Sequence, residues 1–185
     1  ELGFTSVGFA KAGFLPAEST RLSQWLQEGR HGKMEYMENH FDKRTDPTLL
    51  HPGTKTIIVL TYNYFQPKNK IPPSDLKIAM YAYGEDYHKV IKNKIKLLIE
   101  KLNGNISTGI KPRYFTDSAP ILERDWAKYA GLGWIGKNTL LIHPKRGSFF
   151  FLAEILTDLE IESDIEIRDH CGSCTKCIEA CPTEA

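Results

Sequence analysis

A chain of 185 residues, of which 41% are hydrophobic and 25% charged, has enough apolar material for one domain of ordinary size and a small appendage. Its formal net charge of +1 gives no overall electrostatic argument for or against binding to nucleic acid. No apolar stretch approaches the roughly 20 residues of a membrane-spanning helix, so we expect no membrane partner. No secretory signal is visible, and the four clustered cysteines suit a reducing compartment, so we expect a cytoplasmic protein.

The first quarter of the chain predicts a strand followed by two helices. Residues 4–10 predict the strand, residues 16–29 a helix, and residues 33–40 a second, short helix. Residues 44–47 (Arg-Thr-Asp-Pro) should end that short helix, because proline disfavours helical structure in the residue before it. Arg44 either binds an anion or is a solvated loop arginine.

The middle and the end of the chain predict further strands and one long helix. Residues 56–61 are rich in β-branched side chains, which is typical of a strand buried on both faces. Residues 66–74 predict a loop, and residues 78–83 and 149–157 predict strands. The helix that begins near residue 87 carries an apolar stripe made of Ile91, Ile95, Leu98 and Leu102. The lysines of this helix lie largely off the stripe, which a solvated face explains; contact with nucleic acid is the alternative.

Tyr87 and His88 open the long helix, just after a predicted strand. A lone histidine is more often structural, but this placement beside a tyrosine makes a role in a site an equal alternative. Asp86 and His88 begin like the Asp-x-His-x-x-Gly cobalamin signature. Residue 91 is Ile, so that signature is absent.

Residues 116–139 are the stretch around which the chain is organised. A predicted strand over residues 112–116 runs directly into Asp117. Ser118 is suited to cap a helix and Pro120 to open one, since proline loses no needed donor in the first turn. An acidic side chain is therefore expected at a strand end, immediately before a helix.

A helix carrying Arg124 and a glycine loop that ends in Lys137 and Asn138 follow. The loop matches the dinucleotide-binding fingerprint, but that motif needs a strand before it and a helix after it, and here a helix precedes the loop. It also spells most of a Walker loop, yet Asn138 stands where a magnesium-binding Ser or Thr belongs. A tight turn explains the glycines, including Gly136, and leaves Lys137 and Asn138 unexplained. A carboxylate at a strand end with such residues behind it is typical of an α/β site.

All four cysteines lie in one run with the spacing of bacterial ferredoxins. This spacing favours iron–sulfur ligation over zinc, whose ligands usually come as two separated pairs, and over disulfides. In two-cluster ferredoxins the first three cysteines hold one cluster and the fourth holds the other. Neither cluster has its full ligand set here, so we expect the chain to be a fragment. The ligands are Cys171, Cys174, Cys177 and Cys181.

Residues 158–169 carry six acids and a single arginine, which predicts a linker into the cysteine run. We place a domain boundary near residue 165. The expected architecture is an α/β (α+β) domain with a mixed sheet over residues 1–164. The start of a bacterial ferredoxin-like iron–sulfur domain follows over residues 165–185.

Taken together, these motifs resemble those of epoxyqueuosine reductases, the cobalamin- and iron–sulfur-dependent enzymes of queuosine biosynthesis in tRNA. The resemblance covers essentially the whole chain, and the long central block is its most specific part. The resemblance rests on residues 83–88 (Tyr-Gly-Glu-Asp-Tyr-His), 117–127 (Asp-Ser-Ala-Pro-Ile-Leu-Glu-Arg-Asp-Trp-Ala), 131–139 (Gly-Leu-Gly-Trp-Ile-Gly-Lys-Asn-Thr) and the cysteine run.

The resemblance implies that residues 1–164 bind cobalamin and catalyse reduction of the epoxide of epoxyqueuosine at the tRNA wobble position. Asp117 matches the family's catalytic acid, which protonates the departing oxygen. Arg124 matches a residue that binds an anion or orients Asp117, and Tyr87 and His88 match a pair on the substrate side.

Four further residues are assigned to the cofactor site by the same resemblance. Lys137 and Asn138 are expected to contact corrinoid side chains, whose amides and phosphate suit such donors. Gly136 and Arg44 are assigned with them. The cysteine run is expected to hold part of two 4Fe–4S clusters.

The implied partners are tRNA carrying epoxyqueuosine and an electron donor such as flavodoxin or ferredoxin, with a monomeric protein. Family members continue with a second cysteine run and a helical-repeat segment, so we expect this chain alone to be inactive. Two alternatives stay open: a reductive dehalogenase-like corrinoid enzyme with a halogenated substrate, and a non-enzymatic electron-transfer or tRNA-binding module.

Overall fold

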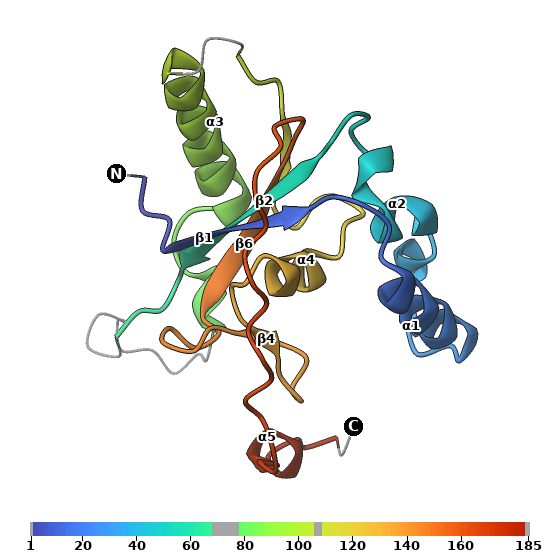
Figure 1. Ribbon diagram of the computed structural model, residues 1–185. Coiled ribbons are helices and arrows are strands. Elements are labelled where there is room, and N and C mark those ends of the chain that lie inside the picture. The colour runs from blue at the N-terminus through green and yellow to red at the C-terminus, as the bar shows by residue number, and fades with distance from the viewer. Residues whose placement is uncertain (1, 68–77, 106–108, 184–185) are drawn as a thin grey trace.

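A four-stranded sheet with helices on both faces forms the body of the computed structural model, which describes residues 2–67, 78–105 and 109–183 (Figure 1). The spatial order of its strands is β1 (Ser6–Lys11), β2 (Thr56–Asn63), β6 (Phe150–Thr157) and β3 (Arg113–Phe115). Each of these strands lies within two residues of the range that the sequence predicts. No helix among the described residues combines the length and the apolar character needed to cross a membrane.

The sheet is antiparallel throughout the described strands, so the prediction of a mixed sheet is wrong. All three pairings, β1 with β2, β2 with β6 and β3 with β6, run antiparallel. A strand–helix–strand order indicates a parallel crossover only when the helix crosses a face of the sheet. The helices between β1 and β2 instead stay beside one end of the sheet, so the chain re-enters in the opposite direction (Figure 1).

The central strand β2 is buried on both faces, as its composition predicts, and it separates two apolar cores. Ile57 and Val59 pack in the core beneath α4 (Glu123–Tyr129). Ile58 and Leu60 pack on the opposite face beneath α3 (Tyr87–Asn105). The stripe of α3 is confirmed at its first half, where Ile91 and Ile95 are fully buried.

The region between β1 and β2 contains α1 (Pro16–Gln27), the 3-10 turn η1 (Glu35–Met37), α2 (Phe41–Thr45) and the 3-10 turn η2 (Pro47–Leu49). The single helix predicted over residues 33–40 is wrong, because His40 adopts a left-handed backbone that separates η1 from α2. The rule for residues before proline holds, since Asp46 is extended and α2 ends before it.

The strand predicted over residues 78–83 is wrong, and the segment forms the 3-10 turn η4 (Met80–Ala82). Ile78 and Tyr81 are about half exposed, so the segment lacks the buried neighbours that would make it a strand. The loop predicted over residues 66–74 lies mostly outside the described residues.

Helix α4 begins three residues later than predicted, at Glu123, and Ser118 does not cap it. Ser118 Oγ instead accepts a hydrogen bond from Lys92 of α3, 3.1 Å away. The predicted stop at Gly131 is confirmed: its φ is +67°, and the N–H groups of Gly131 and Leu132 bond back into the helix.

A hairpin of two short strands, β4 (Trp134–Ile135) and β5 (Leu141–Ile142), follows α4 where the sequence indicates a glycine loop and one strand. A Cβ atom at Gly133 would clash with the Ile142 carbonyl oxygen, which is backbone, so this position requires glycine. A Cβ atom at Gly136 would meet only the ends of the Ile142 and Asn138 side chains. The tight-turn explanation therefore holds at Gly133.

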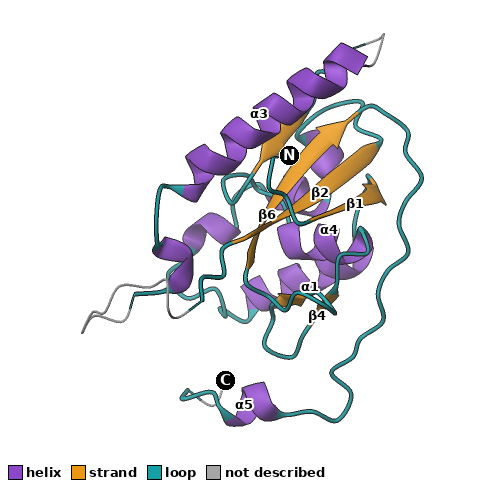
Figure 2. Cartoon of the chain, turned by 90° about the vertical axis from the view of Figure 1, so that its left-hand side faces the viewer, coloured by secondary structure: helices purple, strands orange, loops and turns teal. Residues whose placement is uncertain are grey.

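The acidic segment after β6 runs alongside the outer edge of β1 before it reaches α5 (Lys176–Glu179) (Figure 2). Phe9 and Asp164 exchange two hydrogen bonds of 2.9 Å, and the Lys11 N–H donates to Ser163 Oγ. The segment is therefore attached to the sheet as far as Asp164. A boundary near residue 165 stays a prediction.

Candidate active site

A cleft of about 310 Å³ opens beside β6, where the start of α3 meets the segment before α4. Its apolar walls come from β5, β6 and the segment between them, through Leu141, Phe149, Phe151 and Leu152 among others. Its polar lining consists of Tyr64, Tyr87, Thr116, Asp117, Glu123, Arg124 and Ser148. Three of the four predicted catalytic residues line this cleft: Tyr87, Asp117 and Arg124.

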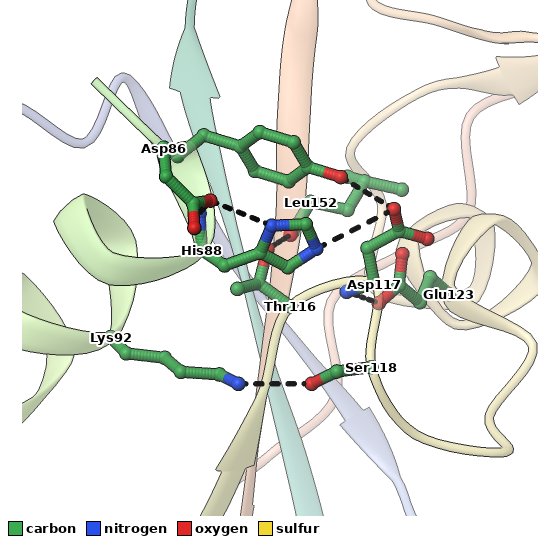
Figure 3. Close-up of polar contacts among 9 residues, drawn as sticks. Asp86, His88, Lys92, Thr116, Asp117, Ser118, Glu123 and Leu152 are labelled. Atoms are coloured by element: carbon green, nitrogen blue, oxygen red, sulfur yellow. Dashed lines mark hydrogen bonds and ion pairs between the residues drawn. The ribbon is translucent and has the colours of Figure 1, made fainter.

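Asp117 stands at the mouth of the cleft in a left-handed backbone, with φ of +52°. Its carboxylate accepts a hydrogen bond of 2.5 Å from the Tyr87 hydroxyl (Figure 3). The Tyr87 ring stacks on Phe151 at 4.0 Å with an angle of 6° between the planes. Burial, and then the bond to Asp117, raise the pKa of Tyr87, so this hydroxyl stays protonated and donates.

His88 joins the same group from the first turn of α3. Its Nε2 lies 3.9 Å from Asp117 Oδ2, and its Nδ1 lies 2.9 Å from Asp86 Oδ1 (Figure 3). Asp86 also accepts the His88 backbone N–H, and the two bonds to His88 lower the pKa of Asp86. Asp86 therefore fixes the imidazole so that its far nitrogen is directed at Asp117.

Two carboxyl groups behind Asp117 were not among the predicted site residues. Glu123 Oε1 accepts the Asp117 backbone N–H at 2.6 Å. Glu154 is fully buried on β6, and burial together with the Glu123 charge raises its pKa. Burial also raises the pKa of Glu123, to about 7. An acid inside the apolar run of residues 150–157 is the signal that could have revealed Glu154.

Arg124 lines the cleft, and its guanidinium donates to the Thr139 carbonyl oxygen at 2.5 Å. Thr139 has a left-handed backbone, with φ of +65°. Arg124 thus holds the end of the β4–β5 turn beside the cleft rather than pairing with Asp117.

The residues predicted to bind the cofactor are dispersed. Lys137 Nζ donates to the carbonyl oxygens of Gly172 and Cys174, at 2.8 and 3.1 Å. Asn138 accepts from the Leu140 N–H within its own turn. Lys137, Asn138 and Gly136 do not line the 310 Å³ cleft.

Arg44 is likewise occupied by its own surroundings. Its guanidinium donates to the carbonyl oxygens of Asn39 and Tyr36, and partial burial lowers its pKa. It too is absent from the lining of the 310 Å³ cleft. The assignment of Arg44 to the cofactor stays a prediction.

The cysteine run lies against the β4–β5 hairpin, and its cysteines form no disulfide among the described residues. The Trp134 indole N–H donates to Cys171 Sγ at 3.4 Å, and the Trp134 ring packs on His170. In the part of the chain described, no three His, Cys, Asp or Glu side chains gather closely enough for a metal site. The donor set nevertheless fits an iron–sulfur cluster, since it is all thiol and has an N–H donor directed at one sulfur.

The chain is similar in sequence to proteins named epoxyqueuosine reductase. Residues 44–118 match the family model described as epoxyqueuosine reductase QueG, DUF1730. An epoxyqueuosine reductase of Leadbetterella byssophila is 52% identical over all of this chain and 61% of its own length.

Solved structures give the same result for the fold. A crystal structure of epoxyqueuosine reductase with an epoxyqueuosine-modified tRNA-Tyr stem loop matches this chain with a TM-score of 0.90 and 32% identity. The match covers all of this chain and 49% of the chain in that structure. The resemblance to epoxyqueuosine reductases is therefore confirmed along the whole chain. The chain spans about three fifths of the length of the curated relative described above.

A reductive dehalogenase, whose structure suggested a mechanism for B12-dependent dehalogenation, shares the fold at a lower level. It matches 96% of this chain with a TM-score of 0.52 and 14% identity. This likeness shows a common fold and carries no argument for a halogenated substrate.

Proposed function

We propose that this chain is the catalytic part of an epoxyqueuosine reductase, which reduces the epoxide of epoxyqueuosine in tRNA to an alkene. The observation that carries the proposal is the position of Asp117 in the lining of the cleft. The Tyr87 hydroxyl donates to its carboxylate, and the His88 imidazole is directed at it. Whole-chain similarity to named epoxyqueuosine reductases supports the choice of substrate. We propose further that the complete protein is a monomeric enzyme of the cytoplasm.

The reaction needs protons as well as electrons. When an epoxide becomes an alkene, both carbon–oxygen bonds break, a carbon–carbon double bond forms, and two electrons and two protons convert the oxygen to water. We assign the proton donation to the departing oxygen to Asp117, because it lines the cleft and matches the catalytic acid of the family that the chain resembles. The Tyr87 hydroxyl and the His88 imidazole hold its carboxyl toward the cleft.

The apolar walls of the cleft suit one part of a flat macrocycle, and its polar lining residues suit amides at the macrocycle's edge. A bound corrinoid supplies low-potential reduction at a carbon–oxygen bond. In this chain Phe149 and Phe151 would supply apolar walls of the cleft, and Asp117 would deliver the proton. Lys137 and Asn138 would meet cofactor side chains only if they leave their present partners.

Electrons would enter through the cysteine run. Cys171, Cys174 and Cys177 would hold most of one 4Fe–4S cluster, and Cys181 would belong to another. The donor would be a small redox protein such as flavodoxin or ferredoxin. The Trp134 N–H would stabilise the thiolate of Cys171.

An aromatic surface beside the cleft suits a nucleic-acid substrate. A second cleft of about 380 Å³ shares Tyr64 and Tyr87 with the first, and Tyr81 and Tyr83 line it further out. Exposed aromatic rings stack on unpaired bases, which is how single-stranded loops of RNA are usually bound. We assign this cleft to bases that flank the modified nucleoside.

The test is a titration of the chain with cob(II)alamin, followed by ultraviolet–visible and electron paramagnetic resonance spectra. We expect a base-off signal that grows on binding and weakens in a Lys137→Ala, Asn138→Ala double variant. Glu100→Ala, an exposed change on α3, is the matched control and should bind as the wild type does. A folded sample that binds no cobalamin, both alone and when extended to the length of its relatives, would contradict the proposal.

A further inference from the structure

Glu154 is an acid that the proposed chemistry does not use. It lies in the middle of β6, between Val59 of β2 and Phe115 of β3, and is 0% exposed. Neither of its oxygens has a hydrogen bond of ordinary geometry among the described residues. An ionised carboxylate in such a place is strongly unfavourable, so Glu154 holds a proton.

Glu123 lies between this buried acid and the cleft. Its Oε1 is 2.6 Å from the backbone nitrogen of Asp117, a distance typical of a charge-assisted hydrogen bond (Figure 3). The residue before Asp117 is also held, since Thr116 Oγ1 donates to the Leu152 carbonyl oxygen at 2.8 Å. The N–H bond to Glu123 is thus the contact that fixes the backbone where the chain leaves β3.

The backbone of Asp117 requires such a contact. A non-glycine residue with φ of +52° is strained, and strain of this kind persists only where neighbouring groups determine the conformation. The next residues form bends rather than helix, and α4 begins only at Glu123. Loss of the Glu123 acceptor would therefore free Asp117 to leave the cleft.

The charges around the two acids decide which one is ionised. Asp117 and Arg124 are the charged groups that act on Glu123, and Asp117 and Glu123 are those that act on Glu154. Arg124, the one cation among them, is hydrogen-bonded to Thr139. Burial raises the pKa of both acids, and only Glu123 has the Asp117 N–H to stabilise a charge.

We propose that Glu123 is a positioning residue of the reaction, which holds Asp117 in the cleft by accepting its backbone N–H. Glu154, which lies beneath Glu123 and is protonated, keeps the single negative charge of these two acids on Glu123. The proposal rests on the proposed function only in taking Asp117 as the proton donor. The claim that Glu123 holds the Asp117 backbone can be tested on this chain alone, without cofactor or substrate.

The first experiment follows the Asp117 amide by nuclear magnetic resonance as the pH is raised from 5 to 9. The amide proton should move downfield with a midpoint at about 7, as Glu123 becomes charged. Glu123→Gln should abolish this step. Glu154→Gln should keep it, because glutamine replaces a protonated acid. Asp125→Asn, a change two residues along α4 that removes the charge of an ion pair with Arg21, is the matched control and should also keep it.

The second experiment compares Glu123→Ala with Glu123→Gln by hydrogen exchange and by turnover. Glutamine still offers an oxygen to the N–H group, and alanine does not. We expect exchange of the Asp117 amide to be about tenfold faster in Glu123→Ala, as for loss of one charged hydrogen bond, and near the wild-type rate in Glu123→Gln. In the chain extended to the length of its relatives, kcat should fall roughly a hundredfold in Glu123→Ala with KM little changed, and Glu123→Gln should recover most of it.

Each result bears on one idea. An Asp117 amide that does not titrate, or a step that survives in Glu123→Gln, would overturn the positioning role. So would equal turnover in Glu123→Ala and the wild type. A wild-type extended protein that titrates as expected but never reduces epoxyqueuosine would instead count against the proposed function.

Discussion

The two faces of the sheet are both well packed, but they differ in what they bury. The core beneath α3 is built from apolar side chains such as Ile58, Ile91 and Ile95. The core beneath α4 also surrounds Glu154, with Glu123 at its border with the cleft. Buried acids without full hydrogen bonding lower stability, so packing does not explain them. The comparison suggests that the α3 face stabilises the fold and the α4 face serves the chemistry.

The largest effect should come from Asp117→Asn, which removes the proposed proton donor and leaves both cores intact. We expect kcat for epoxyqueuosine-tRNA to fall by about 10²- to 10⁴-fold in the chain extended to its relatives' length. The melting temperature should stay near that of the wild type, because the Asp117 side chain is 66% exposed. Asp125→Asn is the control, and equal turnover in Asp117→Asn and the wild type would remove Asp117 from its role.

The α3 face should respond through stability. Ile95→Ala empties a fully buried site and should lower the free energy of unfolding by about 2–5 kcal/mol, measured by urea denaturation of this chain. Leu97→Ala on the same helix is the control, since Leu97 is 48% exposed, and should change stability by less than about 1 kcal/mol. Similar losses in both variants would show that α3 does not pack as described.

The sharpest test of the difference between the two faces is the pH dependence of the stability of Glu154→Gln. The folded pKa of Glu154 and Glu123 is raised, so the folded protein binds more protons than the unfolded chain above about pH 4.5. The stability that this protonation gives is complete below that pH and declines as the pH rises toward and beyond 7.

Glutamine at 154 has no proton to lose, so the variant should lose stability less steeply. The gap between variant and wild type should open by at most about 1.4 kcal/mol for each pH unit above 4.5, measured by urea denaturation between pH 5 and 8. Parallel curves for the two proteins would mean that Glu154 titrates normally.

Much of the fold could be predicted from local pattern. The apolar run at residues 56–61 identified β2, and the stripe at Ile91 and Ile95 identified α3. The direction of the strands could not be predicted, because it depends on where the connecting helices pack and not on the sequences of the strands. The segment 78–83 has the composition of a strand but forms the 3-10 turn η4, and Ile78 and Tyr81 stay about half exposed.

The site divides in the same way. Asp117 and Tyr87 were predicted through their motifs, and the structure brings them within hydrogen-bonding distance. Glu154 stands out in its apolar strand, but its neighbours depend on alternation along β6 and on the position of α4. Lys137 reaches the cysteine run because the segment after β6 returns past the hairpin, which no local pattern indicates.

The attachment of Ser163 and Asp164 to β1 has a consequence for how the molecules behave toward one another. An outer strand normally offers a row of free N–H and C=O groups on which another chain can build, and this leads to aggregation. Here the N–H groups of Phe9 and Lys11 are already occupied by the chain's own acidic segment, and the opposite edge is the three-residue strand β3. The bonds to Phe9 and Lys11 and the shortness of β3 therefore make both borders of the sheet poor templates for a second molecule.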